Sequence, residues 1–120
     1  MADRVLFIGW GASIPGREER GVDAFNDAIG LYGRLQQDGR IESFDVALLD
    51  PNGDLAGYIQ LHGSAAQLAA VRGDDEFRRT LVDASLIVAD LRVFDGFTNE
   101  GIAREMALYQ EAVAKVPQTA

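Results

Sequence analysis

The order of the predicted secondary-structure elements constrains this chain more than any other feature of its sequence. Strand-like and helix-like segments follow one another as strand, helix, strand, strand, helix, strand, and then one more helix. Turn-forming residues punctuate this order at Pro15-Gly16, at Asp50-Pro51-Asn52-Gly53 and at Asp95-Gly96. The order decides which strands share a sheet and which side chains share a face.

Four segments have the pattern of strands. Val5–Trp10 is a continuous apolar run, which is typical of a central strand covered on both faces. Glu42–Leu49 and Leu55–His62 flank an Asn-Gly turn and predict a hairpin. The fourth strand is predicted over Leu86–Phe94.

The helices are marked by their periodicity and their caps. The first is predicted from Glu18 to Gly39, with apolar residues recurring at intervals of three and four. Ser64 begins the second with the spacing of a capping box, Gly73 ends it, and Asp74 caps a further short helix. The last helix is predicted to begin near Asn99. Its apolar seam comprises Ile102, Met106, Tyr109, Val113 and Val116.

This βαββαβ order predicts an α+β fold, a ferredoxin-like sandwich with its antiparallel strands in the order 4-1-3-2. The helices that connect the strands are expected on one face of the sheet. A chain of 120 residues, 48% of them hydrophobic, suits one domain with one core, so we predict a single domain over residues 1–120.

Composition narrows the classes of partner. The formal net charge is −8 and Lys115 is the only lysine, which argues against binding nucleic acid or anionic membranes. The absence of cysteine excludes disulfides, thiolate catalysis and cysteine-ligated zinc. No signal segment opens the chain and no apolar run is long enough to span a bilayer. We therefore expect a cytoplasmic protein with no membrane partner, no bound metal and no cofactor.

Alternation along the third and fourth strands predicts one apolar face and one mixed face. The apolar face, with Ile59 and Leu61, is expected beneath the helices. The mixed face carries Tyr58, Gln60, His62, Asp90 and Arg92. In the order 4-1-3-2 the two strands lie about 9.6 Å apart, so long side chains would converge above the first strand. Such a face is typical of a cavity or of a surface covered by a partner sheet.

These residues suggest the chemistry of a site. His62 is the predicted catalytic residue, because only histidine changes its charge near neutral pH without a large pKa shift. Arg92 suits a carboxylate group. The predicted ligand-binding residues are Trp10, Tyr58, Gln60, Asp90 and Arg92. Two alternatives remain open: Asp90 and Arg92 pair with each other or with a partner chain while His62 merely ends a strand, and Trp10 packs on the first helix.

Two other motifs lack the residues that their chemistry needs. Gly11–Glu18 has the glycine spacing of a phosphate loop, but Arg17 and Glu18 replace its lysine and its hydroxyl residue. Asp50–Leu61 begins like a calcium loop, but leucines occupy the positions of its glycine and its bidentate glutamate. We interpret both segments as structural turns.

Segments along nearly the whole chain resemble a small, uncharacterised bacterial family. They are Val5–Gly11, Pro15–Glu18, Gly39–Phe44, Asp75–Phe77, Gly96–Thr98 and Met106–Tyr109. This resemblance implies no catalytic residues. In layout the chain is also similar to the dimeric α/β barrel proteins, in which two ferredoxin-like monomers join sheet to sheet, and which include cofactor-free monooxygenases and haem-handling enzymes. Pro15-Gly16 resembles the first strand–helix loop of the amino-acid-binding domains called ACT.

Three hypotheses follow for the function. The first is a homodimer whose mixed sheet faces meet and enclose a cavity for a small organic ligand, with or without its turnover. The second is a non-catalytic dimeric module that acts through protein contacts. The third is an ACT-like amino-acid sensor with its ligand at Gly11–Arg17.

Overall fold

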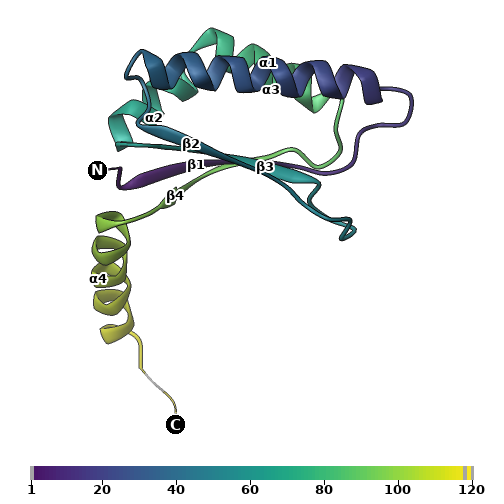
Figure 1. Ribbon diagram of the computed structural model, residues 1–120. Coiled ribbons are helices and arrows are strands. Elements are labelled where there is room, and N and C mark those ends of the chain that lie inside the picture. The colour runs from purple at the N-terminus through teal and green to yellow at the C-terminus, as the bar shows by residue number, and fades with distance from the viewer. Residues whose placement is uncertain (1, 118, 120) are drawn as a thin grey trace.

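The computed structural model, shown in Figure 1, describes residues 2–117 and 119. A four-stranded sheet carries three helices on one face, and a fourth helix leaves the molecule on the opposite side. The elements are β1 (Arg4–Trp10), α1 (Glu18–Gln37), β2 (Ser43–Leu48), β3 (Gly57–Gly63), α2 (Ala65–Arg72), α3 (Asp75–Ser85), β4 (Arg92–Phe97) and α4 (Glu100–Ala114).

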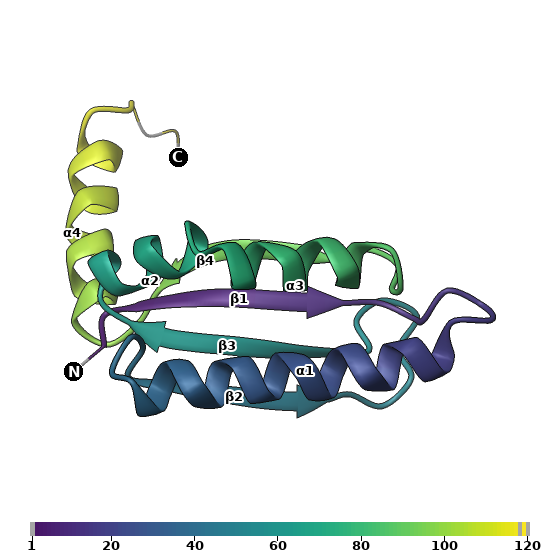
Figure 2. The same ribbon diagram turned by 90° about the horizontal axis from the view of Figure 1, so that it is seen from above.

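The strand order β2-β3-β1-β4 is the predicted one, and every neighbouring pair is antiparallel. The apolar run of β1 lies at the centre of the sheet, where Leu6 stands opposite Leu61 of β3 and Asp95 of β4. Seen from the helix side, α1 and α3 run side by side above the strands (Figure 2). The predicted α+β class and strand order are therefore confirmed.

The core lies between this sheet and the helices α1, α2 and α3. Alternate residues of the central strands point into it, among them Leu6 and Leu61, which are fully buried. The helices contribute their apolar stripes to the same cluster: Ala28, Leu31, Tyr32, Leu35, Leu68, Val71, Phe77 and Leu81. Burial of these side chains holds the helices on one face and leaves the other face of the sheet without a helical cover.

Several local signals act as the sequence predicts. The Ser64 hydroxyl accepts a hydrogen bond from the Gln67 amide, and the Gln67 side chain accepts one from the Ser64 amide, which completes the capping box of α2. Asp74 caps α3 by accepting from the Phe77 amide. In the turn before β3, the Asn52 side chain binds the backbone at both ends and Gly53 has a φ of +78°.

The fourth strand differs from the predicted Leu86–Phe94. Residues 87–89 hydrogen-bond with the loop that follows β1, Asp90 then bends the chain with a φ of +55°, and β4 begins only at Arg92. Asp95-Gly96 is not a turn, because it pairs with Leu6 and Val5 inside β4. The glycine is needed for close approach, since a Cβ at Gly96 would lie 2.9 Å from the Val5 side chain.

The last helix is tied to the body at its base. The Asn99 side chain donates to the Ala2 carbonyl over 2.6 Å, and Arg104 forms an ion pair with Asp3. Gly101 is the one buried residue that the structure describes in α4. Beyond this base α4 projects away from the sheet (Figure 1). Within the described part of the chain, no helix combines the length and the apolar character that crossing a membrane requires.

Candidate functional site

The predicted site residues divide between the two faces of the sheet. We call the face without helices the open face. The side chains of Val5 and Phe7 in β1 point away from the helices, and Gly9 lies on the same face. Their partners across the sheet therefore also lie on the open face: Tyr58, Gln60 and His62 of β3, and Arg92 of β4. Trp10 has the opposite parity and lies on the helix side. The open face comprises Val5, Phe7, Gly9, Ser43, Asp45, Ala47, Tyr58, Gln60, His62, Arg92, Phe94 and Gly96.

The two residues with the strongest predicted chemistry share this face but do not meet. His62 aligns with Val5, whereas Arg92 aligns with Gly9, four residues further along β1. Four residues of strand and two strand spacings separate their backbones by roughly 16 Å. The predicted convergence of these side chains above β1 therefore does not occur within one chain. A catalytic role for His62 stays a prediction.

His62 has a partner that the sequence pattern does not single out. Its Nε2 lies 2.7 Å from an Asp45 carboxylate oxygen of β2, and the His62 side chain is 20% exposed. Only the register between β2 and β3 brings Asp45 beside His62, since 17 residues separate the two in sequence.

Arg92 is also occupied by a carboxylate of its own chain. Its guanidinium group forms an ion pair with Asp54, in the loop before β3, and this hydrogen bond lowers the pKa of the Asp54 carboxyl group. Asp90 lies in the bend before β4 and outside the sheet. One alternative from the sequence is a direct pair between Asp90 and Arg92. In the structure Arg92 pairs with Asp54 instead.

Aromatic rings form the middle of the open face. The Phe7 ring stacks against Tyr58 on one side and Phe94 on the other, with centroid separations of 5.4 Å and 4.8 Å. Gly9 makes room for this stack, because a Cβ there would lie 2.6 Å from the Phe7 ring. Phe94 is 53% exposed, so the stack ends at an apolar surface.

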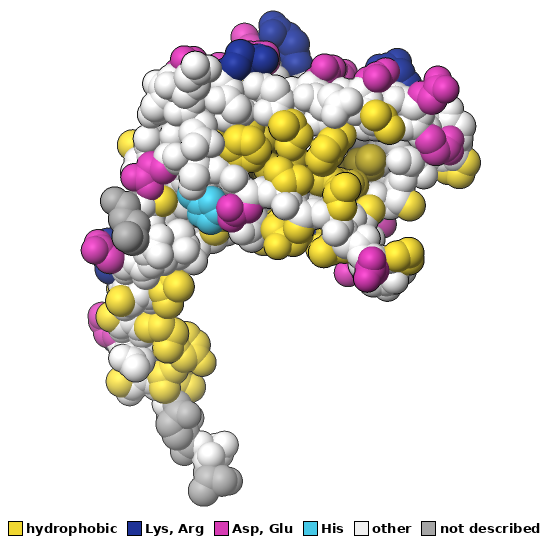
Figure 3. Space-filling view, viewed as in Figure 1, with side chains coloured by type: hydrophobic (Ala, Val, Ile, Leu, Met, Phe, Trp, Pro, Cys, Tyr) yellow, Lys and Arg dark blue, Asp and Glu magenta, His cyan; other side chains and the backbone are white. Residues whose placement is uncertain are grey.

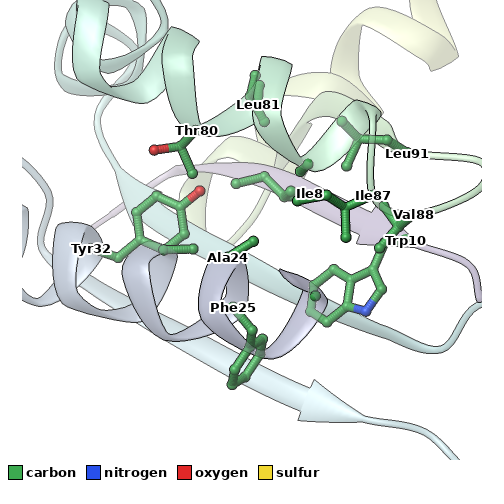
Figure 4. A pocket seen from close by; sticks show the side chains of 13 residues that line it. Ile8, Trp10, Ala24, Phe25, Tyr32, Thr80, Leu81, Ile87, Val88 and Leu91 are labelled. Atoms are coloured by element: carbon green, nitrogen blue, oxygen red, sulfur yellow. The ribbon is translucent and has the colours of Figure 1, made fainter. Parts of the chain in front are cut away.

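An apolar pocket lies on the other side of the sheet, between α1, α3 and β1 (Figure 4). We call it the α1–α3 pocket. Its volume is about 70 Å³ and apolar side chains line almost all of it. Trp10 and Tyr32 lie toward opposite ends of the pocket in Figure 4, with Ile8 between them. Small residues on the helices leave this space open: Gly21, Ala24, Ala28 and Ala84.

Tyr32 is the polar feature of this pocket. The residue is 1% exposed, its ring packs against Phe44 and Phe77, and its hydroxyl group points toward α3 in Figure 4. Burial raises the pKa of Tyr32, so the phenol stays protonated and can donate. Nearby, the Thr80 hydroxyl donates to the Glu76 carbonyl over 2.9 Å. The pocket therefore offers the Tyr32 phenol as a donor within apolar walls, while the Thr80 hydroxyl group points away from Tyr32 toward its own helix (Figure 4).

The loop Gly11–Arg17 has most of its polar groups engaged. The amides of Gly11 and Ile14 donate to carbonyl groups at residues 89 and 87, and the Ala12 carbonyl accepts from the Ala89 amide. The Glu18 carboxylate accepts from the Gly16 amide over 2.9 Å. This arrangement gives no support to a ligand site of the phosphate-loop or ACT kind.

Among residues 2–117 and 119, no group of three or more histidine, aspartate or glutamate side chains gathers closely enough to hold a metal ion. The open face offers one histidine–carboxylate pair and one arginine–carboxylate pair. The α1–α3 pocket offers a neutral phenol. The geometry thus suits the binding of an uncharged molecule better than acid–base chemistry.

Comparisons with known proteins identify the fold. No protein family and no curated protein matches the chain. A solved structure from Pseudomonas aeruginosa is similar with a TM-score of 0.61 and 12% identity, over 82% of this chain and 96% of that one. A protein of unknown function from Nitrosomonas europaea gives 0.60 and 14%, over 82% and 90%.

A third similar structure, from Bacteroides fragilis, is described as a dimeric protein of unknown function with a ferredoxin-like fold. Its TM-score is 0.59 at 11% identity, over 79% of this chain and 96% of that one. At such identities the likeness establishes the architecture and nothing about activity. The chain has the ferredoxin-like fold, and its structural neighbours include proteins without an assigned function.

Proposed function

We propose that this protein binds a small, uncharged organic molecule in the α1–α3 pocket, and that it does so as a homodimer joined through the open face. The observation that carries the ligand proposal is the Tyr32 hydroxyl group, a protonated donor in a pocket whose walls are almost wholly apolar. A ligand oxygen that accepts from this hydroxyl group would add a hydrogen bond worth about 0.5–1.5 kcal/mol.

The pocket limits the class of ligand. Its volume of about 70 Å³ is well below the ~150 Å³ of a cavity that holds benzene, so the enclosed part of the ligand is smaller than an aromatic ring, such as a short branched chain. The apolar walls disfavour charged groups. The ligand also needs an oxygen that can accept a hydrogen bond from Tyr32, as in a small alcohol or ketone.

The dimer part of the proposal rests on the open face. Phe94 leaves an aromatic surface exposed there, and contiguous apolar surface of this kind usually marks an interface. A structural neighbour is described as dimeric, which supports a dimer. A self-complementary face of this kind is what a two-fold homodimer needs.

Trp10 supplies the experiment, because it is the only tryptophan and it lines the pocket. We expect its fluorescence to change on titration with 2-butanol and with 2-methylbutane, which have the same branched shape. Tyr32→Phe should weaken the binding of 2-butanol about three- to tenfold, the loss of one hydrogen bond, and leave that of 2-methylbutane unchanged.

Matched variants locate the site. Ala84→Leu should block both probes because it fills the pocket, whereas Ala70→Leu makes the same change on an exposed part of α2 and should not. His62→Ala should leave binding unchanged, since His62 lies on the opposite face. Loss of binding in His62→Ala would instead support a site on the open face. Failure of both probes, together with a stable dimer, would favour the non-catalytic dimeric module.

A further inference from the structure

The exposed side chains of α4 form an apolar seam along one side of the helix. Ile102, Met106 and Tyr109 are 52%, 49% and 63% exposed, and Val113 continues the same spacing into the last turn of α4. Exposed leucines or valines are common singly, but a row at helical spacing marks a surface made to be covered.

The helix needs such a cover. α4 has 15 residues, and an isolated helix of this length is marginal in water even with a favourable sequence. Its described ties to the body are at the base, where Asn99 and Arg104 hold Ala2 and Asp3. The stability of the remaining turns has to come from packing of the seam.

The position of the seam indicates what covers it. In Figure 3 the hydrophobic side of α4 faces the space beneath the sheet, which is the space that a molecule on the open face would occupy. A second sheet packed there lies about 10 Å away. At about 22 Å, α4 is long enough to lie along the flank of a second copy.

The charges of α4 argue against a membrane as the cover. Interfacial helices carry lysine and arginine on their polar face, where they meet anionic lipids. Around the seam, α4 carries Glu100, Glu105 and Glu111 against the single cation Arg104, and the whole chain has a net charge of −8. Repulsion from an anionic surface would oppose insertion of the seam.

We propose that α4 is an arm that packs against a second copy of this chain, with Ile102, Met106 and Tyr109 on the flank of that copy's open face. This inference rests on the homodimer proposed above and adds that the helix crosses to the partner instead of folding back onto its own sheet. In a two-fold dimer each copy then receives the arm of the other, so the interface combines sheet-to-sheet and helix-to-partner contacts.

The test compares two neighbouring positions of α4. Met106→Glu places a charge on the seam, while Ala107→Glu places the same side chain about 100° further round the helix. In sedimentation equilibrium, Met106→Glu should raise the dimer dissociation constant at least about thirtyfold, because a charge would have to be buried. Ala107→Glu should change it less than about threefold. Circular dichroism should show the same helix content in both variants at a concentration where both are monomers.

Hydrogen exchange separates the arm from the dimer itself. In the wild-type protein, exchange of the α4 amides should accelerate on dilution below the dissociation constant, while amides of α1 stay protected. A stable wild-type dimer with unprotected α4 amides, or with unchanged affinity in Met106→Glu, would overturn the arm and leave the sheet-face dimer standing. A wild-type monomer at all concentrations would overturn both. Protection of α4 by anionic phospholipid vesicles, in a chain that stays monomeric, would assign the seam to a membrane.

Discussion

Gly101 fixes where α4 starts. The backbone passes so close to Asp3 that a Cβ at position 101 would overlap the Asp3 carbonyl oxygen. Alanine normally stabilises a helix relative to glycine, but here the close approach outweighs helix propensity. Because residue 101 has no side chain, the first turn of α4 can pack directly against the backbone of Asp3, just before β1.

We expect Gly101→Ala to lower the free energy of unfolding by more than about 1 kcal/mol, because either the N-terminal segment or α4 has to shift. The matched control is Gly33→Ala in α1, where a Cβ would meet nothing within 4 Å. That change should stabilise the protein by about 0.5–1 kcal/mol. Urea unfolding of the two variants measures both effects, and equal signs would contradict this account.

Residues whose roles depend on their immediate neighbours could be predicted from the sequence. Ser64, Asp74 and the Asn52-Gly53 pair act within a few positions of themselves, so their spacing carries the information. The pairing of His62 with Asp45, or of Arg92 with Asp54, depends on strand register and on the path of a loop. No local pattern contains either of these.

At the scale of elements, the start of α3 responds to pH through its cap. The hydrogen bond from the Phe77 amide, followed by the Arg40 side chain, lowers the pKa of the Asp74 carboxyl group. The folded pKa lies below the unfolded value of about 3.9, so this contribution to stability is complete above that pH. It is lost as the pH falls through the folded pKa.

Asp74→Asn keeps an oxygen acceptor at the cap but does not titrate. We therefore expect the melting temperature of the wild-type protein to fall more steeply than that of Asp74→Asn between about pH 5 and pH 2. Thermal unfolding followed by circular dichroism at a series of pH values measures the difference. Asp3 and Asp54, whose pKa values are also lowered, titrate in both proteins, so their contributions cancel in the difference between the two pH profiles. Parallel pH profiles would rule out the cap as the source.

The fourth strand shows why element boundaries are harder to predict than element order. The apolar run from Leu86 reads as one strand, but β1 ends at Trp10, so residues 86–91 face an irregular loop instead of a ladder. Asp90 bends the chain there without any glycine or proline. Asp95-Gly96, which has the composition of a turn, lies within β4 because the glycine clears Val5.

At the scale of the whole molecule, the open face is the surface whose coverage decides the oligomeric state. Phe94→Asp places a charge beside the aromatic stack and is expected to convert the dimer to a monomer at micromolar concentration. Val82→Asp is the matched control, since Val82 is equally exposed at 53% but lies on α3, away from the open face. Analytical ultracentrifugation distinguishes the two, and a dimer that survives Phe94→Asp would contradict an interface on this face.

Strand alternation predicts the mixed face, but the α1–α3 pocket could not be predicted in the same way. A sheet face follows from a period of two and from strand order. The pocket depends on how far apart α1 and α3 pack, which small residues such as Gly21, Ala24 and Ala28 determine. The spacing of these small residues on one side of α1 is the signal in the sequence that could have indicated the pocket. The same spacing also occurs where two helices pack closely without a pocket, so it does not identify one.

The position of β1 in the sheet also governs when that sheet can be built. β1 is the first strand to be synthesised, yet both of its partners, β3 and β4, lie at least 47 positions later, as in the pairing of Trp10 with Gly57. Among the described strands, only β2 and β3 are neighbours in both sequence and sheet. The nascent chain therefore carries β1 without any partner until β3 has been made, and the other edge of β1 stays unpaired until β4 is made in the final third of the chain. Long-range pairing of this kind folds slowly and exposes aggregation-prone surface meanwhile.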